Sequence, residues 1–193
     1  MTQPVIIDTL LSARWIIPVE PAETVLQDHA IAIDKGIIAA ILPVAEANEK
    51  FTPSERISLD SHALIPGLVN LHTHAAMTLM RGLADDLPLM EWLNNHIWPA
   101  ESQHVSTDYV FDGTRLACAE MIKGGITCFN DMYFFPEAAA EATITAGIRA
   151  AIGMIVIDFP SAYASDTEDY LSKGLALREK YQQHPQLSFC FAP

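Results

Sequence analysis

The first third of the chain alternates short apolar runs with turn residues, a pattern typical of β-strands. The apolar runs lie, in order, at residues 5–7, 15–17, 30–33 and 37–42. The tripeptide Asp34-Lys35-Gly36 between two such runs predicts a hairpin with Gly36 at positive φ. Residues 43–55 are mostly polar and predict a loop or short helix, and 57–64 predicts another strand. We therefore expect a small β-domain, a β-sandwich segment, over residues 1–65.

From Gly67 onward the pattern changes to strands that alternate with helices, which indicates a parallel α/β architecture. Strands are predicted at 68–71, 126–130, 149–157 and 187–191. Helices are predicted at 78–81, 89–95, 107–123, 136–145 and 167–182. This order gives about four βα units, half of an eight-stranded barrel. The predicted fold class is therefore α/β, with residues 66–193 forming the front half of a TIM-like (β/α)8 barrel.

Composition narrows the classes of partner. Half of the 193 residues are hydrophobic and the formal net charge is -13, which disfavours a nucleic-acid partner. The first residues lack the basic stretch of a signal peptide, and no apolar run approaches the ~20 residues that cross a membrane. We expect no membrane partner and a cytoplasmic protein. Because the last residues, 187–193, form an apolar strand, we also expect a longer protein of which this is the front part.

The candidate chemistry begins at His72-Thr73-His74, which ends an apolar strand that follows Pro66-Gly67. Side chains two residues apart on a strand point to the same side, so the two imidazoles can be presented together. Neutral imidazole is a good ligand for zinc or iron. A chance pair of surface histidines is the alternative, but the strand context favours a metal. A catalytic zinc normally has three protein ligands and an open position, so two of the ligands are visible here.

Cysteine ligation is disfavoured. The three cysteines, Cys118, Cys128 and Cys190, form no Cys-x-x-Cys pair and are typical of small buried side chains in a reducing compartment. The Pro-Cys-x-x-Cys pattern of the small zinc deaminases that act on nucleic acids is also absent. Zinc held by histidine is therefore the expected cofactor, with iron or manganese left open.

The stretch from Pro66 to Glu101 resembles the first barrel strand and following segment of the amidohydrolase superfamily. The matching runs are 66–74, 75–82, 85–93 and 97–101. They are similar to the group of 5′-methylthioadenosine and S-adenosylhomocysteine deaminases, relatives of the triazine hydrolases. The resemblance implies a metal-dependent hydrolase barrel with one zinc ion per subunit, a small-molecule nucleoside substrate and a homo-oligomer.

The resemblance also implies the reaction. It is hydrolytic deamination of adenine nucleosides in purine salvage: 5′-methylthioadenosine, adenosine and, as a further candidate, S-adenosylhomocysteine. Ammonia and an inosine-type product are released. A third histidine, an aspartate and the glutamate that shuttles protons are implied to lie beyond Pro193, so we predict no catalytic acid or base within this chain and no activity for it alone. Two alternatives stay open: hydrolysis of another heterocycle (guanine, 8-oxoguanine or a chloro- or amino-triazine), and a non-catalytic metal-binding fragment.

Two residues are candidates for substrate binding. The resemblance places Glu101, in the loop after the first barrel strand, against the ribose hydroxyls, and a carboxylate offers two acceptor oxygens for such a pair. From the sequence without the resemblance, a capping or solvated glutamate is the favoured interpretation of Glu101. The resemblance suggests that Trp92 lines the nucleoside pocket, while a core tryptophan is the alternative. Asn130 and Asp131 end the second strand, where we expect a strand-end cap.

One departure from the family concerns the 5′ side of the substrate. Some relatives carry arginines in and after the third strand that can meet the carboxylate of S-adenosylhomocysteine. Here Arg149 stands at the start of that strand, the wrong end for the site, and the next arginine is Arg178. A partly buried carboxylate normally needs a cationic partner. We therefore hypothesise that uncharged 5′-methylthioadenosine or adenosine is preferred.

Overall fold

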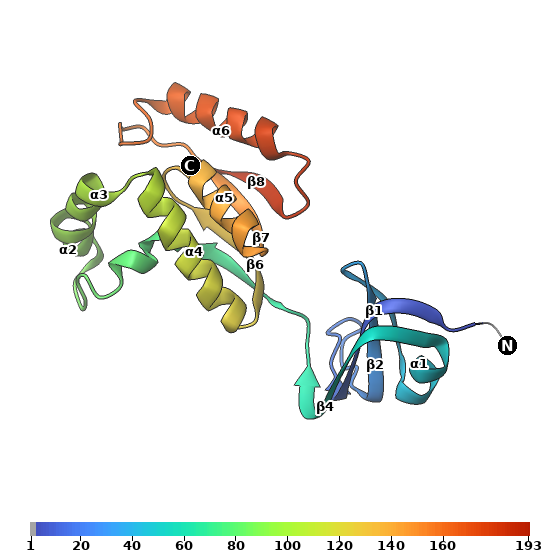
Figure 1. The fold of residues 1–193 in the computed structure, drawn as a ribbon. Coiled ribbons are helices and arrows are strands. Elements are labelled where there is room, and N and C mark those ends of the chain that lie inside the picture. The colour runs from blue at the N-terminus through green and yellow to red at the C-terminus, as the bar shows by residue number, and fades with distance from the viewer. Residues whose placement is uncertain (1–2) are drawn as a thin grey trace. The chain divides into compact units, whose positions relative to one another are not determined.

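The first unit of the chain is built on a single β-sheet. The structure, a computed structural model, describes residues 3–193 and divides into two units at the Pro66–Gly67 bond. The strands of the first unit are β1 (Val5–Ile16), β2 (Leu26–Asp34), β3 (Ile37–Pro43) and β4 (Phe51–Leu64), in the order β3-β2-β1-β4 (Figure 1). Helix α1 (Val44–Lys50) connects β3 to β4. The sequence predicted a β-sandwich segment here. Within residues 3–66 the structure has one four-stranded sheet and one helix.

The hairpin predicted at residues 34–36 is confirmed. Strands β2 and β3 pair antiparallel with Asp34 opposite Ile37, and the two residues between them, Lys35 and Gly36, have φ angles of 50° and 75°. Two consecutive positive φ angles match the right-handed twist of the strands that they connect. Glycine at the second of these positions therefore sets the register of the hairpin.

Strand β4 begins earlier than predicted. The sequence pattern placed its start at residue 57 because 43–55 are polar, but the strand starts at Phe51 and pairs parallel with β1 from that residue onward. β4 is an edge strand with β1 as its only neighbour. An edge strand tolerates both solvent-facing polar side chains and a proline such as Pro53, so its first residues carry no apolar signal.

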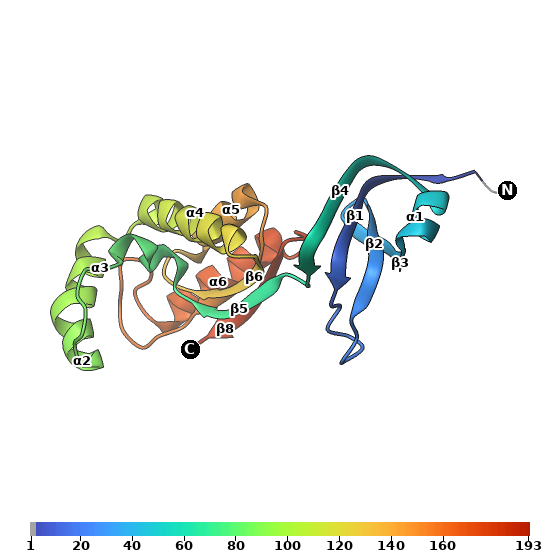
Figure 2. The same cartoon turned by 90° about the horizontal axis from the view of Figure 1, so that it is seen from below.

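The second unit carries a parallel sheet in sequence order, β5-β6-β7-β8, as the predicted half barrel requires. Its strands are β5 (Leu68–Thr73), β6 (Ile126–Met132), β7 (Arg149–Ile155) and β8 (Leu187–Ala192). Helices α4 (Thr107–Lys123), α5 (Pro136–Ala146) and α6 (Thr167–Tyr181) alternate with the strands and pack beside them (Figures 1 and 2). None of the helices formed by residues 3–193 is both long and apolar enough to cross a membrane.

Local capping residues fix one end each of α4 and α5. Ser106 caps α4, because its side-chain oxygen accepts a hydrogen bond from the backbone nitrogen of Tyr109 at 3.2 Å. Gly147 ends α5 in the left-handed conformation, with φ of 75°. Ser106 thus fixes the start of α4, and Gly147 fixes the end of α5, just before β7 begins.

The connection between β5 and α4 is more helical than predicted. It contains a 3₁₀ turn η1 (Ala75–Met80) and then an unbroken helical arm of α2 (Leu89–Trp92), the π turn η2 (Leu93–Ile97) and α3 (Trp98–His104). The predicted helix ended at residue 95, and Glu101 was expected in a loop. Instead the helical arm continues through Pro99, which lies just after the π turn, so Glu101 is held on a helix.

Gly113 of α4 allows a close approach to the segment that follows the histidine pair. A Cβ atom at this position would lie 2.5 Å from the backbone oxygen of Ala76. We expect Gly113→Ala to lower the free energy of unfolding by about 1–3 kcal/mol, because the backbone would have to shift. Urea denaturation of the full-length protein measures this. The matched control is Gly124→Ala, whose Cβ would meet nothing closer than 3.4 Å; equal losses in both variants would contradict the packing argument.

Candidate active site

The site begins at a bulge near the end of β5. Asn70 of β5 lies opposite Phe129 of β6, whereas Thr73 lies opposite Asp131. Three steps along β5 therefore correspond to two along β6, so β5 carries one extra residue at this point. A bulge of this kind bends a strand and changes where its side chains point, and bulges are frequent next to active sites.

Two asparagine side chains replace the backbone hydrogen bonds that the bulge interrupts. The backbone nitrogen of His72 donates to Oδ1 of Asn70 at 3.3 Å, and Nδ2 of Asn130 donates to the carbonyl oxygen of Leu71 at 3.2 Å. Backbone groups left without such partners would be costly where water is excluded. The predicted cap at Asn130 is thus confirmed, because its side-chain amide donates a hydrogen bond to the backbone of the neighbouring strand β5.

The histidine pair comes together as the spacing predicted. The ring centroids of His72 and His74 are 5.0 Å apart, with the ring planes at 83°. Nδ1 of His74 lies 2.7 Å from the carbonyl oxygen of Met132. Since a carbonyl only accepts, Nδ1 carries a proton, so in the neutral imidazole Nε2 is the nitrogen with a free lone pair. This is the arrangement that orients a histidine for metal binding, so the donor set present fits a metal.

The pair is incomplete as a metal site. Within residues 3–193, no group of three or more histidine, cysteine, aspartate or glutamate side chains is placed to hold a metal ion. His72 is exposed and His74 is half-buried, so the imidazoles face outward rather than into the core. Among the described residues the two imidazoles are the candidate donors, and their role as metal ligands stays a prediction.

Asp131 fixes the backbone immediately after the histidines. Its side chain is almost fully buried, and Oδ1 accepts a hydrogen bond from the backbone nitrogen of Ala75 at 2.7 Å. Burial raises the pKa of Asp131 to about 6, while the Ala75 hydrogen bond and the nearby His74 act in the opposite direction. Asp131 is thus a cap for the turn that starts after His74, as its position at the end of the strand suggested.

Glu101 meets the sheet through Tyr133, which directly follows β6. The Tyr133 hydroxyl donates to Oε1 of Glu101 at 2.7 Å. Partial burial raises the pKa of Glu101, and the hydrogen bond from Tyr133 and the charge of His74 oppose that rise. Burial and the neighbouring carboxylate raise the pKa of Tyr133 far above its ordinary value, so the phenol remains a donor. Tyr133 also lies near His74, with ring centroids 6.4 Å apart.

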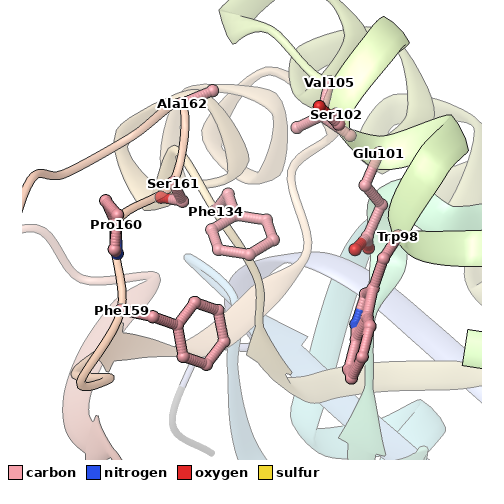
Figure 3. Close-up of a pocket in the computed structure, with 9 residues that line it drawn as sticks. All are labelled: Trp98, Glu101, Ser102, Val105, Phe134, Phe159, Pro160, Ser161 and Ala162. Atoms are coloured by element: carbon pink, nitrogen blue, oxygen red, sulfur yellow. The ribbon is translucent and has the colours of Figure 1, made fainter. Parts of the chain in front are cut away.

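A cavity of about 540 Å³ adjoins Glu101, a size suited to a small molecule. Figure 3 shows the Glu101 carboxylate beside Trp98, across the cavity from Phe134 and Phe159. The lining residues come from α3, from the end of β6 and from the loop after β7: Trp98, Glu101, Ser102, Val105, Phe134, Phe159, Pro160, Ser161 and Ala162. Glu101 is the only charged residue among these nine.

Trp92 and Glu101 are placed differently. Glu101 borders the cavity, whereas half-buried Trp92 on α2 is not among the described residues that line it. Trp98 of α3 lines the cavity in its place. Sequence reasoning passed over Trp98, Tyr133 and Phe134. The signal available was the aromatic run directly after the second barrel strand, at the end where barrel active sites lie.

Comparison with known proteins shows what this chain is similar to. The sequence model of the amidohydrolase family matches residues 63–187. A 5-methylthioadenosine/S-adenosylhomocysteine deaminase of Saccharophagus degradans is 49% identical over all of this chain, which spans 43% of that protein's length. The crystal structure of an adenosine deaminase from Xanthomonas campestris with bound zinc has a TM-score of 0.97 and 46% identity, over 99% of this chain and 44% of that one.

More distant structures share the fold. Guanine deaminase from C. acetobutylicum, solved with bound guanine, has a TM-score of 0.80 at 23% identity and covers 96% of this chain and 46% of its own. Such a likeness establishes the half-barrel architecture and no more. The chain spans less than half the length of these relatives.

Proposed function

The chain belongs to the amidohydrolase family, and on that premise we propose that the full-length protein is a metal-dependent hydrolytic deaminase of adenine nucleosides. It would convert 5′-methylthioadenosine or adenosine into the inosine-type product and ammonia. The observation that carries the proposal is that Tyr133, whose ring lies 6.4 Å from that of His74, holds Glu101 at the edge of a cavity beyond the carboxyl ends of the parallel strands. The relatives named as deaminases of these nucleosides support it.

His72 and His74 are the proposed metal ligands in this chain. Zinc is the proposed ion, one per subunit, because the similar adenosine deaminase holds zinc. A zinc ion lowers the pKa of water enough for hydrolysis at neutral pH. The contribution of this chain is orientation: the Met132 carbonyl holds the proton on Nδ1 of His74, so Nε2 is the atom offered to the metal. We propose that the remaining ligands and the proton shuttle belong to parts of the protein outside these residues.

Glu101 is the proposed contact for the sugar. Its carboxylate borders the cavity and is partly removed from water, where hydrogen bonds from a vicinal diol are strong. Trp98 and the phenylalanines of the cavity offer apolar surface for the rest of the nucleoside. Trp92 is not among the residues that line the cavity, and its contact with the substrate remains a prediction. The cytoplasmic location and the homo-oligomer implied by the resemblance likewise remain predictions.

The absence of a cation among the nine residues that line the cavity supports a preference for an uncharged 5′ group. We expect kcat/KM of the full-length protein to be higher for 5′-methylthioadenosine than for S-adenosylhomocysteine, by roughly tenfold or more, because a carboxylate loses a charged hydrogen-bond partner. Ammonia release with each substrate measures the ratio. A higher value for S-adenosylhomocysteine would contradict the prediction.

A variant that adds a cation to the cavity tests the same substrate preference by the opposite change. Ser102 lines the cavity from α3, and its side chain is exposed, so a longer residue fits there without disturbing a core. We expect Ser102→Arg to raise kcat/KM for S-adenosylhomocysteine relative to 5′-methylthioadenosine. Ser102→Gln, similar in length and uncharged, is the control and should leave the ratio unchanged.

A further inference from the structure

The hydroxyl of Tyr133 connects the sheet that carries the histidines to the helix that carries Glu101. We propose that Tyr133 is a positioning residue for sugar recognition, whose hydroxyl holds one oxygen of the Glu101 carboxylate so that the carboxylate is oriented toward the cavity. This inference rests on the proposed function and adds a second residue to sugar recognition. Tyr133 itself is not among the residues that line the cavity.

The first support is the contrast between a fixed donor and a movable acceptor. The Tyr133 ring is buried in the core beside Phe134, with ring centroids 5.5 Å apart, so the sheet determines where its hydroxyl lies. Glu101 has a flexible side chain on the helical arm. Its carboxylate makes one side-chain hydrogen bond within residues 3–193, and that bond is the one from Tyr133. Removing this hydroxyl would leave the carboxylate to be ordered by the substrate, at a cost in binding.

The second support is the number of acceptor positions. A carboxylate has two oxygens with about four lone-pair positions in all. Tyr133 occupies one position on Oε1, at 2.7 Å, which leaves Oε2 and the rest of Oε1 for two adjacent sugar hydroxyls. Orientation by Tyr133 is therefore compatible with a two-point contact to a diol. The raised pKa of the phenol keeps the hydroxyl protonated at neutral pH.

A second tyrosine whose hydroxyl is buried, Tyr109, provides a matched control. The hydroxyl of Tyr109 on α4 is also buried, but it has no hydrogen-bond partner in the part of the chain that the structure describes. Tyr109→Phe and Tyr133→Phe thus remove the same atom from two buried phenols, and only the second loses a hydrogen bond to Glu101. A purely structural effect of removing a buried hydroxyl would appear in both variants.

The test uses the full-length protein with two substrates, adenosine and 2′,3′-dideoxyadenosine, which lacks the diol. We expect Tyr133→Phe to lower kcat/KM for adenosine about tenfold, mainly through KM, because a hydrogen bond that orients a charged group is lost. For the dideoxy substrate the change should be less than about twofold, because there is no diol for Glu101 to bind. Zinc content and Tm should stay close to those of the unmodified protein. Tyr109→Phe should leave both substrates unchanged.

A double-mutant cycle keeps the inference testable whatever the size of the single effects. In a Glu101→Ala background, Tyr133→Phe should have no further effect on adenosine turnover, because its target is gone. Equal losses for adenosine and the dideoxy substrate, or additive losses in the cycle, would overturn the positioning role while leaving the deaminase proposal intact. If the unmodified protein deaminates no nucleoside, both the role of Tyr133 and the proposed function fail.

Discussion

Replacing His74 by alanine in the full-length protein is expected to abolish stoichiometric zinc binding and to lower kcat/KM for 5′-methylthioadenosine by on the order of 10⁴-fold or more. The imidazole of His74 is oriented by the Met132 carbonyl at 2.7 Å, so the variant lacks the proposed ligand whose ring orientation is set by that contact. Elemental analysis of the purified variant and an assay of ammonia release measure the two effects together.

A histidine outside the site is the control for this variant. His62 is an exposed residue of β4 in the first unit, and its replacement by alanine should change neither zinc content nor turnover. Full zinc occupancy in His74→Ala would contradict the assignment of this side chain as a ligand. Loss of zinc together with a large fall in Tm would also be seen if the variant misfolded. Turnover and Tm of the variant should therefore be measured again after zinc is added.

Replacing Glu101 by alanine is expected to lower kcat/KM for adenosine by roughly 10²-fold, because two hydrogen bonds to a charged group are lost and Tyr133 is left without its acceptor. A free base such as adenine has no sugar for Glu101 to hold. Any turnover of adenine should therefore fall by no more than about threefold. Steady-state kinetics with the two substrates separate recognition of the sugar from the chemical step.

An exposed glutamate of the same helical arm is the matched control. Glu91 lies on α2 with its side chain in solvent, and Glu91→Ala should leave both substrates unaffected. Equal losses for adenosine and adenine in Glu101→Ala would show that this residue acts on the reaction or on folding rather than on the sugar. That result would favour the alternative of a heterocyclic base as the natural substrate.

Local signals were sufficient for much of the fold. The hairpin at Lys35-Gly36, the Ser106 cap and the left-handed Gly147 are each decided by one or two residues whose conformational preferences are strong. The four parallel strands follow from apolar runs separated by helices. The pairing of His72 with His74 follows from their separation by one residue at a strand end.

The predictions from sequence differ from the structure where tertiary contacts override local conformational preference. The early start of β4 depends on its pairing with β1, and three of the β4 residues that pair there, Thr52, Glu55 and Arg56, are polar. The helical arm continues past Pro99 because a π turn precedes it, and no local signal predicts that turn. The bulge next to the histidines depends on the register between β5 and β6, which are far apart in the sequence. The hydrogen bond from Asn130 to the Leu71 carbonyl depends on the same register.

The sequence predicted the close approach of the two histidines better than it predicted the surroundings of the candidate site. His72 and His74 lie side by side near the end of β5, and Glu101 meets Tyr133 just after β6, but the tryptophan at the cavity is Trp98 rather than Trp92. The two tryptophans lie on one helical arm, and its course decides which of them reaches the cavity. Tyr133 gave no signal of its own, because its role depends on a contact with a helix 32 residues earlier in the chain.

The most direct test of the central claim is the zinc content of the full-length protein, determined on the same sample as ammonia release from 5′-methylthioadenosine. We predict about one zinc ion per subunit and turnover that is lost on removal of the metal and restored by zinc. Zinc without turnover would retain the metal site and contradict the nucleoside substrate. The absence of bound metal in a folded protein would contradict the assignment of His72 and His74, on which the proposed function depends.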